Sequence, residues 1–282
     1  MKKAGFLLII IGCFFTSCSD FFESPLPDYE LTFQPKLYVF SVISPNLKTT
    51  TVEIKRNQPL SGLSSSRAVY VDNATVKIVA GKDTITLWYD AAYEIYRVSA
   101  DTLLIKPKAT YQLFVTTPDG LKAQSECTVP DTLLKTADLK VYYNNSKDVA
   151  GDSSFSALLT FKNLEGEGDF YDVIYEDYNY YSNPATINSV SSWGLFQGKN
   201  ALGSTLSTKE QTYYPQYRFN KTQRLSFLKL LLTDENYYRY HQTVRDFQRA
   251  RENPFAEDSP VFSNIKGGLG IFAAFTRKNL SL

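Results

Sequence analysis

The sequence predicts a mainly β protein with one α-helix in its C-terminal half. Short runs of alternating apolar and polar residues, separated by turn residues, are typical of strands. The aromatic share of 15%, with 20 Tyr and 19 Phe, suits pleated and half-buried surfaces. The length of 282 residues is enough for one large domain or two ordinary ones.

Residues 1–17 have the features of a lipoprotein signal peptide. Two lysines follow the initiator Met, and the apolar run 4–15 is shorter than the roughly 20 residues that a membrane span needs. Phe15-Thr16-Ser17-Cys18 resembles the lipobox of bacterial lipoproteins, in which the cysteine is acylated and becomes the new N-terminus. The prediction is therefore lipidation of Cys18, against the alternative of an ordinary signal peptide cut elsewhere.

Residues 18–35 read as an extended tether, because three prolines and four acidic residues keep the segment stretched and solvated. Without residues 1–17, the chain holds 28 basic and 29 acidic residues, a net charge of −1. This balance argues against nucleic acid as a partner, since that needs a basic face. Only Cys18 and Cys127 would remain, and Cys127 is predicted to be a buried, inert thiol.

Residues 36–130 are predicted to form an immunoglobulin-like β-sandwich that folds independently. Turn signals at 44–46, 81–83 and 118–120 separate its strands, and about 95 residues with seven strands suit that architecture. The expected strands are 37–43, 50–55, 75–79, 84–89, 94–98, 111–117 and 121–129.

Residues 131–282 are predicted to form a second β-rich domain. The helix is expected over 234–251, with Thr233 or Asp234 as its N-cap and Asn253-Pro254 as its end. Its apolar face, at helical spacing, would consist of Tyr237, Tyr240, Val244 and Phe247. Strands are expected at 139–143, 155–161, 170–181, 213–219, 225–232 and 271–275, with a long polar loop at 182–203.

No catalytic constellation is apparent, so the sequence favours a non-enzymatic protein without a cofactor or a metal site. His241 is the single histidine, and neither a zinc ligand set nor a Ser-His-Asp pattern accompanies it, which favours a structural or surface role. The acidic run 165–169 does not match a calcium loop. A glycosidase would need two facing carboxylates, such as Glu176 and a distant partner. The glycines at 267–270 suit a tight turn better than a phosphate loop.

A run of aromatic residues is the most suggestive feature for binding. Exposed tyrosine offers a large and rigid contact area for a glycan, a peptide or a protein partner. Ordinary packing in a core or on a half-exposed sheet is the alternative. The residues predicted to contact a ligand or partner are Tyr175, Tyr178, Tyr180, Tyr181 and, within the polar loop, Trp193.

The segment 253–255 followed by 263–272 resembles a signature of the domain of unknown function 4249 family of Bacteroidetes lipoproteins. Ala273 and Ala274 stand where that signature would have a further glycine. Such lipoproteins are often encoded beside TonB-dependent receptors, and the family provides no catalytic residues to carry over. The resemblance implies an outer-membrane or cell-surface lipoprotein that captures a ligand or assists a TonB-dependent receptor. The alternative is a glycan hydrolase anchored to the envelope.

Overall fold

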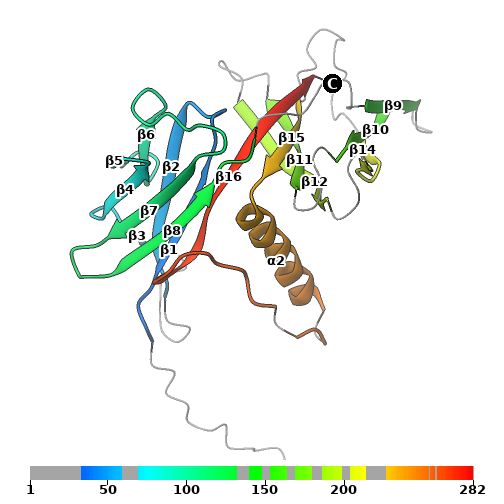
Figure 1. Ribbon diagram of the computed structural model, residues 1–282. Coiled ribbons are helices and arrows are strands. Elements are labelled where there is room, and N and C mark those ends of the chain that lie inside the picture. Colours follow the sequence, from blue (N-terminus) through cyan, green and yellow to red (C-terminus); the bar gives the residue numbers. More distant parts are fainter. Residues whose placement is uncertain are drawn as a thin grey trace, which may run out of the picture. The chain divides into compact units, whose positions relative to one another are not determined.

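The computed structural model confirms a mainly β protein with a helix in its C-terminal half (Figure 1). It describes residues 33–58, 69–131, 140–147, 153–163, 169–179, 186–198, 204–213, 227–253, 255–257 and 259–281. The signal peptide, Cys18 and nearly all of the tether lie outside these residues. Pro35–Leu282 forms one compact unit. The finer prediction of an immunoglobulin-like arrangement stays a prediction.

The described elements follow the alternation read from the sequence, with most strand ends within two residues of the prediction. The first half contains β1 (Leu37–Ile43), β2 (Thr49–Arg56), β3 (Val69–Tyr70), β4 (Thr75–Ala80), β5 (Asp83–Asp90), β6 (Ile95–Ser99), β7 (Thr110–Thr116) and β8 (Lys122–Thr128). The second half contains β9 (Lys140–Lys147), β10 (Ser153–Lys162), β11 (Phe170–Asn179), β12 (Thr186–Gln197), β13 (Thr205–Ser207), β14 (Gln211–Tyr213), β15 (Phe227–Thr233), α2 (Glu235–Glu252) and β16 (Gly268–Ser281).

The strands of the first half enclose one apolar core. They pair in the order β1-β2-β6-β5-β4-β7-β8. A bridge between Gln124 in β8 and Lys266, just before β16, brings the two ends of this order together. The core takes buried residues from β1, β2, β4, β5, β6, β7, β8 and β16, including Leu37, Ile54 and Ile78. Cys127 is buried in it at 2% exposure, as predicted, and burial raises the pKa of its thiol.

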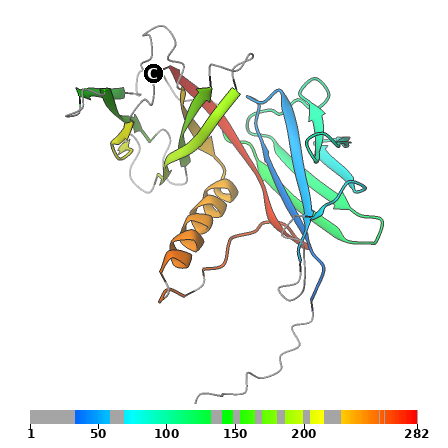
Figure 2. The same ribbon diagram turned by 180° about the vertical axis from the view of Figure 1, so that it is seen from behind.

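Strand β16 belongs to both halves of the chain. Its first seven residues pair in parallel with β1, and its last seven pair antiparallel with β15. The segment 36–130, expected from the sequence to fold independently, therefore lacks the strand that covers the outer side of β1. Figures 1 and 2 show β16 running along β1 and on to β15.

Two glycines before and within β16 allow this close pairing. Gly267 and Gly270 have φ angles of +79° and +107°, which only glycine adopts readily. A Cβ at Gly270 would lie 2.0 Å from the carbonyl oxygen of Val39. A Cβ at Gly267 would lie 2.4 Å from the carbonyl oxygen of Lys122. The predicted backbone role of the glycine motif is confirmed at these positions, although one lies inside a strand.

Helix α2 covers one face of the sheet that β16 extends. Its N-cap is Asp234, whose carboxylate accepts the Tyr237 N–H at 2.8 Å. Tyr237 and Tyr240 are buried against Ile271 and Ala273 of β16, with Val244 at the edge of the cluster. The opposite face of β11 and β15 forms a separate core that includes residues of β10 and β12.

The prediction of a polar loop at 182–203 is wrong over most of that range, because β12 occupies Thr186–Gln197. Two register shifts against β11 interrupt the strict alternation that marks a strand. Val190, Ser191 and Ser192 are exposed one after another, so the sequence here does not alternate between apolar and polar residues as a strand usually does. The strand expected at 213–219 lies largely outside the described residues, and β14 ends at Tyr213.

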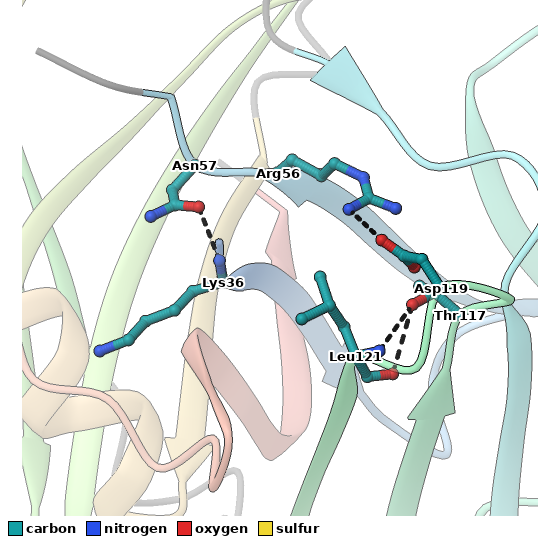
Figure 3. A network of polar contacts seen from close by, with 6 residues as sticks. All are labelled: Lys36, Arg56, Asn57, Thr117, Asp119 and Leu121. Carbon is teal, nitrogen blue, oxygen red and sulfur yellow. Dashed lines mark hydrogen bonds and ion pairs between the residues drawn. The ribbon is translucent and has the colours of Figure 1, made fainter. Parts of the chain in front are cut away.

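The predicted hairpin turn at 118–120, between β7 and β8, contacts the end of β2 through an ion pair (Figure 3). Arg56 at the end of β2 pairs with Asp119 at 2.7 Å and lowers the pKa of that carboxyl to about 2. The Thr117 side chain accepts the Leu121 N–H at 3.1 Å.

Among the described residues, no helix has the length and apolarity that a membrane crossing requires.

Candidate ligand-binding groove

The aromatic residues singled out in the sequence do not form an exposed surface where the structure describes them. Tyr175 and Trp193 are 5% and 6% exposed. Their rings stack with centroids 5.6 Å apart, inside the core between β10, β11, β12 and β15. The exposure that motivated the contact prediction is therefore absent at these two residues, because their strand face is covered. The Tyr178 side chain, Tyr180 and Tyr181 lie outside the described parts.

A polar network around the buried carboxylate of Asp172 joins α2 to the sheet. The hydroxyl groups of Tyr237 and Ser192 both donate to the carboxylate of Asp172, the former at 2.9 Å. Arg245 donates to the Ser192 hydroxyl at 2.5 Å. Burial raises the pKa of Asp172 despite these donors. Because its groups satisfy one another, this network accounts for helix attachment rather than for chemistry.

His241 lies on the same side of α2 and is packed among aromatic rings, which is the structural one of the two roles that the sequence left open. Its ring centroid is 4.2 Å from that of Tyr237 and 5.4 Å from that of Tyr240. Burial, and secondly Arg245, lower the pKa of His241 to about 4. The imidazole is therefore neutral at physiological pH, inside the packing of the helix.

Glu176, considered for a hydrolase pair, forms an ion pair with Lys229. Both side chains are about one-tenth exposed, so the carboxylate has little access to a substrate. Within the described ranges, no group of three His, Cys, Asp or Glu residues is placed to hold a metal ion.

An open groove of about 560 Å³ lies elsewhere, between β7, β8, the start of α2 and the segment leading into β16. β7 and β8 provide one wall, and the chain between α2 and β16 provides the other. The lining side chains are mostly amides and aromatic rings. They include Gln112, Phe114, Gln124, Glu126, Asn236, Phe262, Asn264 and Lys266.

The groove wall formed by the segment 262–266 is fixed by hydrogen bonds. The Asn264 amide accepts the Phe272 N–H at 2.9 Å and donates to the Phe272 carbonyl oxygen at 2.7 Å. The Ser125 hydroxyl donates to the Asn264 carbonyl oxygen at 2.9 Å. The Arg239 guanidinium lies 4.2 Å from the centroid of the Phe262 ring. These contacts hold the wall in place before any ligand arrives.

The other groove wall presents groups that remain available for a ligand. The side-chain amides of Gln112 and Gln124 bond to nothing else in the described part of the protein, and both side chains point outward from the sheet. The Phe114 ring is 38% exposed. Of the described lining residues, Glu126 is the one carboxylate and Lys266 the one ammonium. An amide both donates and accepts, so the groove suits a polar, largely uncharged ligand.

Little in the sequence indicates this groove. Gln112, Phe114, Gln124 and Glu126 occupy the outward positions of ordinary alternating strands. The segment 263–266 was noticed only for its resemblance to a family signature. What brings the two walls together is the Gln124–Lys266 bridge, a contact between residues 142 positions apart in the chain.

The match to a known family spans nearly the whole chain. The family described as "Domain of unknown function (DUF4249)" matches residues 22–281. That range includes both walls of the groove, α2 and β16. No curated protein matches the chain.

Proposed function

Because the chain belongs to the DUF4249 family, we propose that it is a lipid-anchored outer-membrane or cell-surface lipoprotein that captures a ligand without converting it. In this role it acts as an accessory subunit of a TonB-dependent uptake system. The lipobox at Cys18 supports the anchor, and the resemblance to lipoproteins encoded beside TonB-dependent receptors supports the partner. Neither a cofactor nor a metal enters the proposal.

The observation that carries ligand capture is the preformed groove beside β7 and β8. One wall is held by the Asn264 and Ser125 hydrogen bonds, and the other presents the amides of Gln112 and Gln124. Preorganisation lowers the entropic cost of binding. Amide and aromatic side chains fix the orientation of a ligand without chemical reactivity.

The alternative of an anchored glycan hydrolase has less support. A glycosidase uses two carboxyl groups that face each other across the scissile bond. Among the described residues, the groove lining contains one carboxylate, Glu126. Glu176 is paired with Lys229, and Asp172 is 2% exposed beneath α2.

Replacing the two glutamines tests capture at the groove. We expect the double variant Gln112→Ala and Gln124→Ala to bind at least about tenfold more weakly. Without the two amides, polar groups of the ligand are left unpaired, which costs roughly 1.4 kcal/mol or more of binding free energy. The probes are panels of soluble oligosaccharides and of short peptides, measured by titration calorimetry. The matched control is Gln242→Ala, an exposed glutamine on α2. Equal affinities of wild type and the double variant for every bound probe would overturn the assignment.

A further inference from the structure

Phe114 lines the groove, and the outer face of the same sheet continues from it to a second exposed ring, Trp88. Strands β5, β4 and β7 pair in that order (Figure 1). Thr86, Lys77 and Phe114 form one cross-strand row. Trp88 is two residues beyond Thr86 and therefore shares its face. Two strand spacings and two residues along a strand separate the Cα atoms of Trp88 and Phe114 by about 12 Å.

The Trp88 ring is exposed yet held in place. It is 55% exposed, and Tyr93, at the adjoining hairpin turn, is 68% exposed. The Arg97 guanidinium lies 5.3 Å from the centroid of the Trp88 ring and 6.0 Å from that of Tyr93. Asp90 binds Arg97 at 2.8 Å. Exposed aromatic rings that are fixed by neighbours offer contact area at low entropic cost.

We propose that the groove and this face form one continuous track that binds an oligosaccharide. The proposal rests on the proposed capture function and names its ligand class. Sugar rings pack their apolar C–H faces against Phe114 and Trp88, while Gln112 and Gln124 bind hydroxyl groups. A hydroxyl group both donates and accepts, as an amide does, so the two are matched.

The sheet edge beside the groove argues against an extended peptide as the ligand. A peptide strand would bind by pairing with the free edge of β8. That edge is already occupied, because Gln124 exchanges backbone hydrogen bonds of 3.0 and 2.8 Å with Lys266. The Glu126 carbonyl oxygen accepts from the side chains of Asn236 and Asn264, each at 3.4 Å. What remains open is the flat face with its rings and amides.

The charges along the track allow both neutral and acidic sugars. Lys77, Lys122 and Lys266 are exposed on or beside it, and Glu126 opposes them. This small positive surplus accommodates uronic acid units as well as neutral ones. A panel that includes both kinds of sugar therefore covers the ligand class.

Oligosaccharides of two lengths can distinguish binding at the groove from binding at Trp88. The mature full-length protein is titrated with hexasaccharides and trisaccharides of neutral glucan and of polygalacturonate. We expect Trp88→Ala to weaken hexasaccharide binding by about tenfold and to change trisaccharide binding by less than about twofold, because a trisaccharide fills only the groove. Phe114→Ala should weaken both. The control Phe255→Ala removes a ring that is 93% exposed but lies off the track, and should change neither.

Trp88→Ala also removes the contact with Arg97, so a second variant that keeps this contact is needed. Thr86→Gln adds bulk between the two rings without adding charge, so it should also weaken hexasaccharide binding selectively, with folding checked by thermal melt. Unchanged hexasaccharide affinity in both variants overturns the track. If Gln124→Ala still lowers that affinity, capture at the groove stands. Absence of oligosaccharide binding by the wild type overturns the sugar assignment, and capture then depends on whether peptides bind at the groove.

Discussion

Single side chains in this protein owe their properties to what covers them. His241 is neutral because burial lowers its pKa to about 4, whereas burial raises the pKa of Asp234, the helix cap, to about 7. The sequence narrows the role of His241 to a structural or surface one, and the helix cap to Thr233 or Asp234. It cannot supply these pKa shifts, because they depend on packing against β16 and β11.

The opposite pKa shifts of His241 and Asp234 predict that each residue changes the pH dependence of the free energy of unfolding in its own direction. The folded pKa of His241 lies below its ordinary 6.5, so its stabilising contribution is full above pH 6.5 and is lost as pH falls toward 4. Between pH 7.5 and 4.5, the wild type should lose more free energy of unfolding than His241→Gln does. We expect this difference to be roughly 2–3 kcal/mol. Urea unfolding at the two pH values measures this.

Asp234→Asn is the companion variant and should respond in the opposite direction. The folded pKa of Asp234 is raised from 3.8, so its contribution is full below pH 3.8 and is lost as pH rises toward 7. Asparagine keeps the N-cap hydrogen bond without the charge. Parallel pH profiles of wild type and His241→Gln would contradict the burial argument.

At the scale of elements, alternation and capping predicted most of the strands and the helix. Strand β12 was missed because bulges against β11 break its alternation. Strand β16 was recognised only in part, at 271–275, because glycine-rich sequence is typical of turns. Its true extent depends on β1, whose backbone lies too close for any residue larger than glycine at position 270.

Gly270→Ala tests the fit between β16 and β1. The added Cβ would lie 2.0 Å from the Val39 carbonyl oxygen, at a φ angle of +107°. We expect a loss of at least about 3 kcal/mol, from backbone strain and a clash that no rotamer relieves. In a thermal melt, this corresponds to a drop of roughly 6–12 °C.

Leu269→Ala is the matched control, because that neighbouring side chain is 42% exposed. It should change the free energy of unfolding by no more than about 1 kcal/mol. If the two variants melt at the same temperature, the close pairing of β16 with β1 is incorrect.

At the scale of the whole molecule, the proposed function depends on where the body is held. The predicted anchor at Cys18 and the tether 18–35 would keep the body near a membrane while leaving it free to meet a partner. A tether of 17 residues beyond the cysteine spans at most about 60 Å. Capture and transfer to a receptor would then occur at high local concentration.

Cys18→Ala tests the anchor. We expect the variant to leave the membrane fraction and to lose fatty-acid label, because several acyl chains bind stably at about 0.8 kcal/mol per buried CH₂. Fractionation after washing, with an unmodified membrane protein as a marker, measures this. Cys127→Ala is the control, since its buried thiol should carry no label. Retention of the Cys18 variant with unchanged labelling would remove the lipoprotein assignment.

The sequence by itself determined the properties that arise from neighbouring residues. These are the mainly β character and the helix near 234–251, with its cap placed at Thr233 or Asp234. The export signal, the lipobox at Cys18 and the lack of a disulfide after processing stay predictions. Tertiary structure decided which strand faces are covered, because a period of two says that faces alternate and not what lies against them. It buried Tyr175 and Trp193 and left Trp88 and Phe114 exposed. It also built the groove, since the two walls meet only through the pairing of Gln124 with Lys266.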